Sequence, residues 1–181
     1  NKGLEFLFAK TDIENFVDNL PFKLTKSQYK TSYEILDDLM KEYPMKRLLQ
    51  GDVGSGKTVV ASVAIYAAYI SGYQVALMAP TEVLAEQHFN SIKIFLNNYD
   101  LPINLLTSSI KDRESILKNI ENGTPGLIIG THALIQEKIQ FTNLGLAIID
   151  EQQRFGVEQR KKLINQNGVI PDQLIMTATP I

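Results

Sequence analysis

Six short runs of apolar residues, rich in Ile, Leu and Val, are the feature that most strongly constrains how this chain can fold. Within each run the apolar residues are nearly continuous instead of alternating with polar ones. Strands that are buried on both faces have this pattern, and such strands are typical of parallel sheets covered by helices. The runs cover residues 47–50, 74–79, 103–107, 126–130, 144–150 and 173–179.

The segments between these runs are predicted to form helices. Residues 57–71 are small and apolar and stop before Gly72, and residues 111–122 are amphipathic and stop before Gly123. Glycine commonly follows the last turn of a helix. Residues 81–96 place apolar side chains at helical spacing. Because strands and helices alternate, the sequence predicts an α/β fold with a doubly wound, mostly parallel sheet flanked by helices.

Composition excludes several classes of protein. The 181 residues suit one domain, and a hydrophobic fraction of 44% is enough for a core. The absence of cysteine excludes disulfides and thiolate zinc sites, and it fits a reducing cytoplasm. No apolar run approaches the roughly 20 residues that span a bilayer. The net charge of −2 means that any attraction to nucleic acid must come from a local surface.

The stretch "GDVGSGKTVV", residues 51–60, contains the pattern G-x-x-x-x-G-K-[ST] between a predicted strand and a predicted helix. Its glycines allow successive backbone N–H groups to point at phosphate oxygens, and the helix presents its positive end to the same anion. The lysine reaches the outer phosphates, and the hydroxyl binds magnesium. The candidate phosphate-binding residues are Gly51, Gly54, Ser55, Gly56, Lys57 and Thr58.

A phosphate site of this kind also needs an acid for the metal ion. The apolar run 144–150 ends in Asp150, and Glu151 follows it. At the carboxyl end of a strand, Asp150 would hold magnesium through water, and Glu151 would orient or deprotonate the attacking water. A solvated strand end is the alternative interpretation. Lys57, Asp150 and Glu151 are the predicted catalytic residues, and Thr58 and Asp150 the predicted magnesium ligands.

From residue 20 to residue 181 the chain resembles the superfamily 2 helicases and translocases. The motifs that carry the resemblance are "LTKSQ" (24–28), "GDVGSGKT" (51–58), "APTEVLAEQ" (79–87), "GTHAL" (130–134), "DEQQ" (150–153) and "TAT" (177–179). Longer segments such as "MAPTEVLAEQH" and "DEQQRFGVEQR" resemble the corresponding segments of the RecG family of bacterial branched-DNA helicases. The Mfd-like transcription-repair coupling translocases share "RFGV" and "TATPI" and are the alternative.

The resemblance implies a RecA-like P-loop NTPase lobe that uses ATP and Mg²⁺ and acts on branched or forked DNA in recombination and repair. It also implies a cytoplasmic, nucleoid-associated bacterial protein. The roles that it assigns are adenine recognition for Gln28, contacts with DNA phosphates for Thr81, Gln87, Thr131 and His132, and coupling of the nucleotide and DNA sites for Gln153, Thr177 and Thr179. Members of this family usually have His where this chain has Gln153, which leaves the strength of the coupling open.

Several of these residues have simpler interpretations. The pattern Thr25-x-x-Gln28 is a helix capping box that needs no ligand. Phe22 could stack on a base or pack beside the helix start. Thr81 could be an ordinary helix cap. His88 and His132 could suggest a metal pair, but they fall on different predicted elements with no third ligand, so a metal role is disfavoured.

The resemblance also predicts the domain organisation. Residues 1–23, with a short helix near 12–19, are expected to connect to an upstream wedge domain, and residues 24–181 to form the first motor lobe of a helicase. The second lobe would lie outside this chain, so the lone lobe is expected to bind ATP but to hydrolyse it poorly. A non-catalytic nucleotide-binding module is a competing class. A small-molecule kinase is disfavoured, because it would need an acceptor site.

Overall fold

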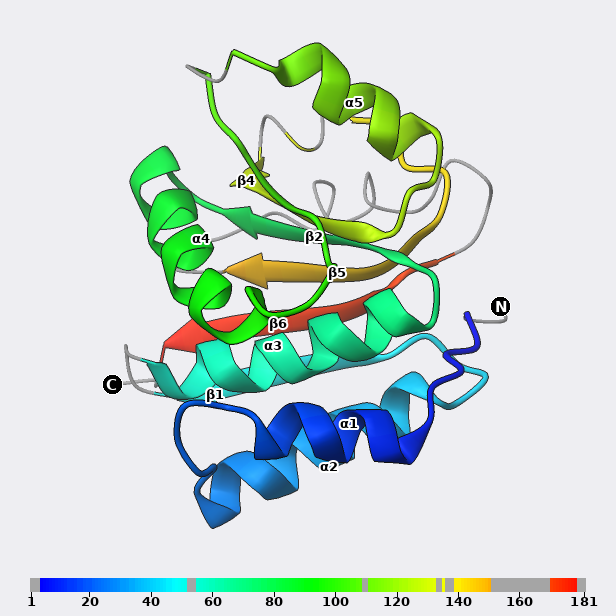
Figure 1. The fold of residues 1–181 in the computed structure, drawn as a ribbon, viewed down its shortest axis with the longest axis vertical. Helices are drawn as coiled ribbons and strands as arrows, with labels where there is room; N and C mark the ends of the chain where they lie inside the picture. The colour runs from blue at the N-terminus through cyan, green and yellow to red at the C-terminus, as the bar shows by residue number, and fades with distance from the viewer. Residues whose placement is uncertain are drawn as a thin grey trace.

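A computed structural model describes residues 4–51, 55–108, 111–132, 135, 139–150 and 170–178. These residues contain one six-stranded sheet in which every neighbouring pair of strands is parallel, in the order β1-β6-β5-β2-β4-β3 (Figure 1). The strands are β1 (Lys46–Gly51), β2 (Gln74–Ala79), β3 (Ile103–Leu106), β4 (Gly126–Thr131), β5 (Leu144–Asp150) and β6 (Asp172–Ala178). The predicted strands and the parallel sheet are confirmed.

The strand sequences are nearly continuous in apolar residues because both faces of the sheet are covered. In β2, Val75 and Leu77 belong to one buried cluster, whereas Ala76 and Met78 belong to a second cluster on the opposite face. All six residues of β2 are buried. Successive side chains of a strand point to opposite faces, so the strands inside the sheet contribute to both clusters, whereas the edge strand β1 contributes only Leu49, to the first.

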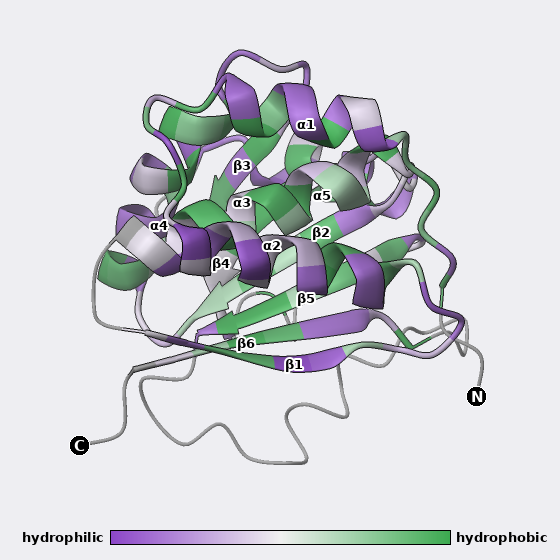
Figure 2. Cartoon of the chain, turned by 90° about the horizontal axis from the view of Figure 1, so that it is seen from below, coloured by the Kyte–Doolittle hydropathy of each residue, from purple (hydrophilic) through white to green (hydrophobic). Residues whose placement is uncertain are grey.

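Five helices are described, and they divide between the two faces of the sheet. They are α1 (Lys10–Asp18), α2 (Lys26–Leu39), α3 (Ser55–Ile70), α4 (Glu82–Leu96) and α5 (Arg113–Glu121). Helices α1 to α4 contribute to the first cluster, and α5 contributes Ile120 to the second. Figure 2 shows hydrophobic residues along α3 and the strands beneath it, and hydrophilic bands on α1 and α2. No described helix is long and apolar enough to cross a membrane.

Helix α2 shows how a mostly polar sequence becomes a core element. Its buried residues are Ser32, Ile35, Leu36 and Leu39, which lie on one face at helical spacing. The capping box at its start is visible in the sequence, but the bounds of the helix are not. With only one narrow apolar stripe, the segment gives a weak local signal, and packing against α3 stabilises it.

Two glycines end helices as predicted. Gly72 and Gly123 have φ values of 90° and 76°, the left-handed region that glycine adopts without steric cost. After α3, the N–H of Tyr73 donates to the Ala68 carbonyl and that of Gly72 to the Tyr69 carbonyl. The same pair of hydrogen bonds follows α5, so both ends are Schellman motifs.

The segment before α2 packs on the core. Phe6, Ile13 and Phe16 are each 1% exposed and belong to the same cluster as the sheet. The Phe16 ring stacks on Tyr66 with centroids 4.6 Å apart. The described part of this segment therefore covers α3. The assignment of residues 1–23 as a connector between domains stays a prediction.

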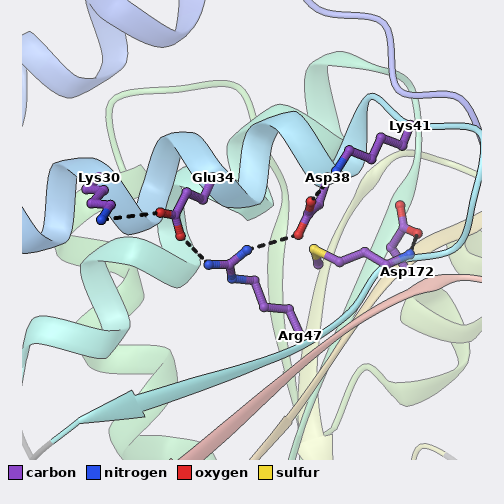
Figure 3. A network of polar contacts seen from close by, with 7 residues as sticks. Lys30, Glu34, Asp38, Lys41, Arg47 and Asp172 are labelled. Atoms are coloured by element: carbon purple, nitrogen blue, oxygen red, sulfur yellow. Dashed lines mark hydrogen bonds and ion pairs between the residues drawn. The ribbon is translucent and has the colours of Figure 1, made fainter.

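A network of charged side chains fixes α2 to the edge strand β1 (Figure 3). The guanidinium of Arg47, in β1, pairs with Glu34 and donates from Nη1 to Asp38 Oδ2 at 3.0 Å. Lys41 Nζ lies 3.1 Å from Asp38 Oδ1. Arg47 presents its planar fork to two carboxylates one helical turn apart, which sets the rotation of α2 relative to β1.

Candidate nucleotide-binding site

The predicted site residues that the structure describes lie mainly at one edge of the sheet. All the strands run in the same direction, so their carboxyl ends share this edge. Gln50 of β1 pairs with Thr177 of β6, and Asp150 of β5 pairs with Met176 of the same strand. Farther along, Ala79 of β2 pairs with Thr131 of β4. The register thus brings the ends of β1, β6, β5, β2 and β4 into one row.

Lys57 lies in the first turn of α3 and spans from β1 to β6. Its side chain passes so close to Gly51 that a Cβ atom there would lie 3.2 Å from Lys57 Cγ. Its Nζ donates a hydrogen bond of 3.0 Å to the backbone carbonyl of Thr177. Thr177 Oγ1 is buried and has no hydrogen-bond partner within the described residues. The ammonium group is therefore held at the carboxyl end of β6.

Gln28 is both a helix cap and a neighbour of the glycine-rich loop. Both halves of the capping box are formed: the Gln28 N–H donates to Thr25 Oγ1 at 3.1 Å, and the Thr25 N–H donates to Gln28 Oε1 at 3.0 Å. The other end of the amide faces the loop, since a Cβ on Gly56 would lie 3.3 Å from Gln28 Nε2. The capping interpretation is confirmed, and the same side chain lies beside the predicted phosphate loop.

Asp150 is the last residue of β5 and is 5% exposed. His88 Nε2, from α4, lies 2.7 Å from Asp150 Oδ2. This contact was not predicted from the sequence, because His88 was considered only as a metal ligand beside His132. One feature of the sequence could have indicated it: His88 is a polar residue at a helical position that faces the core, and buried polar groups need hydrogen-bond partners.

The oxygen donors at this edge suit magnesium. Thr58, in the first turn of α3, is 8% exposed and supplies a hydroxyl, and Asp150 supplies a carboxylate. Magnesium is usually held by one or two protein oxygens together with substrate phosphates and water. No group of three or more His, Asp or Glu side chains that could cage a metal occurs among the described residues. The donor set therefore fits a magnesium ion that arrives with a nucleotide.

The predicted nucleic-acid contacts lie beside this site, at the ends of β2 and β4. Thr81 caps α4, accepting a hydrogen bond of 3.2 Å from the Leu84 N–H, so its capping role is confirmed. Gln87 is exposed on the same helix. Thr131 is the last residue of β4, and His132 follows it. Thr81 and Gln87 therefore follow the end of β2, in the cap and the second turn of α4. Thr131 and His132 lie at the end of β4.

Phe22 packs against the body of the lobe. Its ring meets Phe95 of α4 edge-on, with centroids 5.8 Å apart, and it remains 41% exposed. The packing interpretation is thus supported by a contact. Other predicted site residues lie outside the described residues: Gly54, Glu151, Gln153 and Thr179, together with the side chain of Ser55.

A parallel sheet with a glycine-rich loop between β1 and α3, and an acid at the end of β5, has the form of a P-loop nucleotide-binding lobe. Residues 25–181 match the model of the DEAD/DEAH box helicase family, and the chain therefore belongs to that family. Membership implies nucleotide binding. A DEAD box protein from Methanococcus jannaschii has the same fold, with 21% identity, a TM-score of 0.66, and coverage of 100% of this chain and 51% of that one.

The chain is also similar to bacterial proteins named ATP-dependent DNA helicase RecG. It is 51% identical over 182 residues to that of Bacillus subtilis and 54% identical over 181 residues to that of Streptococcus pneumoniae, in each case over 99% of this chain and 26% of the relative. A structure of RecG bound to a three-way DNA junction matches with 43% identity and a TM-score of 0.88, over 99% of this chain and 24% of that one. The chain spans about a quarter of the length of these relatives.

Proposed function

We propose that this chain is the first, ATP-binding motor lobe of an ATP-dependent DNA helicase that remodels branched DNA, such as stalled forks and junctions, in recombination and repair. The observation that carries the proposal is the meeting of Lys57, Thr177 and Asp150 at one edge of the sheet, where Lys57 Nζ reaches the Thr177 carbonyl at 3.0 Å. The similarity to RecG proteins supports the choice of branched DNA. A bacterial, nucleoid-associated location follows from the same proposal.

Each residue at the edge has a role in this proposal. The N–H groups of the loop around Gly54, Ser55 and Gly56 bind phosphate oxygens, and Lys57 exchanges the Thr177 carbonyl for the outer phosphates. Thr58 and Asp150 would hold magnesium, which supplies positive charge to the phosphates when bound. These groups neutralise charge without taking part in a covalent step.

Two further residues complete the nucleotide site. Gln28 keeps its bond to the Thr25 N–H and presents Nε2 toward the base, which would select adenine. Glu151, which follows Asp150 in the sequence, would orient or deprotonate the attacking water. A carboxylate next to the metal-binding acid suits hydrolysis, because the water must be activated close to the transferred phosphoryl group.

Thr81, Gln87, Thr131 and His132 would contact DNA phosphates. Such contacts fix the position of a protein on DNA but carry no sequence information directly. Gln153, Thr177 and Thr179 would couple this surface to the nucleotide site. The proposed partners of this lobe are a second motor lobe and an upstream wedge domain of the same protein.

Replacing Lys57 with alanine tests the nucleotide site. Lys57→Ala removes the ammonium group that bonds to the Thr177 carbonyl and should abolish most of the ATP affinity, as measured by calorimetry with magnesium present. Lys46→Ala is the matched control, because Lys46 is an exposed lysine at the opposite end of β1. Unchanged affinity in Lys57→Ala, or an equal loss in both variants, would contradict the proposal.

A further inference from the structure

The contact between His88 and Asp150 joins two elements that are distant in sequence. Asp150 ends β5, a strand held between β2 and β6, so its backbone is fixed from both sides. His88 lies in the middle of α4. Its Nε2 is 2.7 Å from Asp150 Oδ2, and the two side chains are 16% and 8% exposed. The bond is short and largely shielded from water.

The hydrogen bond constrains the carboxylate. An ionised carboxylate only accepts hydrogen bonds, so Nε2 carries the hydrogen in this contact. A carboxylate at the end of a strand can rotate about its side-chain bonds, and each rotation moves the oxygens relative to a bound ion. Fixing one oxygen restricts the orientations that the carboxylate plane can take. Groups that orient metal ligands in this way commonly change metal affinity by about ten- to a hundred-fold when they are removed.

The backbone on the other side of this bond is also fixed. Helix α4 is capped by Thr81 and packs against α3, β2 and β4, and its buried residues Ala85, Ile92 and Phe95 surround the His88 position on the inward face. The first turn is tied to the loop after β3, where Glu82 Oε1 accepts a hydrogen bond of 2.8 Å from the Ser108 N–H. The imidazole is therefore presented to Asp150 from a well-held element.

We propose that His88 is a positioning residue for Asp150, and that its Nε2–H sets the orientation in which the carboxylate binds magnesium with the nucleotide. This inference rests on the proposed function, because it assigns Asp150 to the metal. His88 touches neither nucleotide nor ion in this role. It acts only through the carboxylate.

The test separates magnesium affinity from nucleotide affinity. Binding of ADP is titrated by calorimetry in EDTA and again over a range of magnesium concentrations, for the parent chain and for His88→Leu, His88→Gln and Asn90→Ala. Asn90 is exposed on the same helix and serves as the control. In His88→Leu the magnesium concentration at half-effect should rise about ten- to a hundred-fold, with ADP affinity in EDTA unchanged. His88→Gln keeps a donor and should recover most of the loss.

A second readout does not depend on nucleotide. Nitrogen-15 NMR of histidine should show Nε2 protonated in the parent chain, and Asp150→Asn should change the His88 ring signals. In the Asp150→Asn background, His88→Leu should cause no further change in magnesium dependence. Thermal unfolding of each variant shows whether it is folded before the comparison is made.

The outcomes distinguish the inference from the proposed function. If the parent chain binds ADP with a magnesium dependence that His88→Leu leaves unchanged, the positioning role is wrong and the proposed function stands. An equal loss of affinity with and without magnesium would also overturn the positioning role. If the parent chain binds no nucleotide, the proposed function fails and the inference fails with it.

Discussion

Asp172 illustrates how a single buried residue makes stability depend on pH. It begins β6 and is 0% exposed, and its Oδ1 accepts a hydrogen bond from the Met45 N–H. Its Oδ2 is buried without a hydrogen-bond partner within the described residues. Burial raises the pKa of this carboxyl to about 7, the charge of Asp38 adds to the rise, and the Met45 bond opposes it. The folded chain therefore holds this proton to a higher pH than the unfolded chain.

Removing the Asp172 carboxyl should make the free energy of unfolding depend less on pH. Between about pH 4 and pH 7 the folded state binds more protons at Asp172 than the unfolded state, so the free energy of unfolding falls as the pH rises through this window. Asp172→Asn should remove a decrease of about 4 kcal/mol, measured by urea unfolding at several pH values. The exposed Asp37→Asn is the control. An identical slope in Asp172→Asn and the parent chain would contradict the assignment.

At the scale of elements, close approach of β5 to the end of α3 depends on one glycine. A Cβ on Gly145 would lie 2.5 Å from both Cβ and Cγ of Tyr73, a separation that no folded structure accommodates without movement. Tyr73 in turn anchors the segment before α1. Its hydroxyl donates to the Glu5 carbonyl at 2.9 Å, and its ring centroid is 4.9 Å from that of Phe6. A side chain at position 145 would therefore displace Tyr73, the residue that this segment contacts.

Gly145→Ala should destabilise the fold by about 1 to 3 kcal/mol, because Tyr73 and the chain packed on it must shift. The cost should be smaller in a Tyr73→Gly background, where the opposing atoms are gone. Gly123→Ala is a useful comparison: its cost, about 1 kcal/mol from the positive φ, should not depend on Tyr73. Thermal or urea unfolding measures Tyr73→Gly and each glycine variant with and without it. An equal cost of Gly145→Ala in both backgrounds would exclude the steric explanation.

At the same scale, α4 is the element that lies between the two predicted surfaces. Thr81 at its start and Gln87 on its exposed side belong to the predicted DNA surface, and His88, the next residue, contacts Asp150. Neighbouring positions on one helix point in different directions. The consecutive residues Gln87 and His88 can therefore belong to different sites, one at the predicted DNA surface and one beside Asp150. A sequence motif alone does not reveal this difference.

At the scale of the whole molecule, the rate of ATP hydrolysis depends on whether an arginine side chain reaches the bound nucleotide. A supplied arginine stabilises the transition state of phosphoryl transfer by about three to five orders of magnitude in rate in GTPases. Of the arginines in this chain, Arg47 pairs with Glu34 and Asp38, and Arg113 donates to the Thr107 carbonyl at 2.9 Å. Arg154 and Arg160 lie outside the described residues. Both described arginines are thus already bonded to other groups of the chain.

This chain by itself should therefore hydrolyse ATP slowly, even with saturating forked DNA, and a longer version that carries a second motor lobe should be stimulated strongly by the same DNA. Steady-state ATPase assays of both proteins make the comparison. Glu151→Gln in the longer protein should abolish the activity and serves as the control for contaminating enzymes. Similar turnover in the two proteins, lost in each on Glu151→Gln, would show that the 181 residues contain a complete catalytic site.

Features that depend on local chain chemistry could be predicted from the sequence alone. The strands were predicted because they are apolar on both faces, and the ends of α3 and α5 because Gly72 and Gly123 allow a positive φ. The capping box of Thr25 and Gln28 is a local pattern, and so is the loop before Lys57. These properties involve residues within a few positions of one another, so the order of the strands in space does not affect them.

Only the tertiary structure decided which distant residues meet. The bond from His88 to Asp150 spans 62 residues, and that from Lys57 to the Thr177 carbonyl spans 120. Both depend on β6 and β5 lying between β1 and β2 in the sheet. The burial of Phe6 and Phe16 likewise depends on α1 packing over α3. A one-dimensional pattern records the polarity of each residue, whereas strand order and helix packing determine which partner that residue finds.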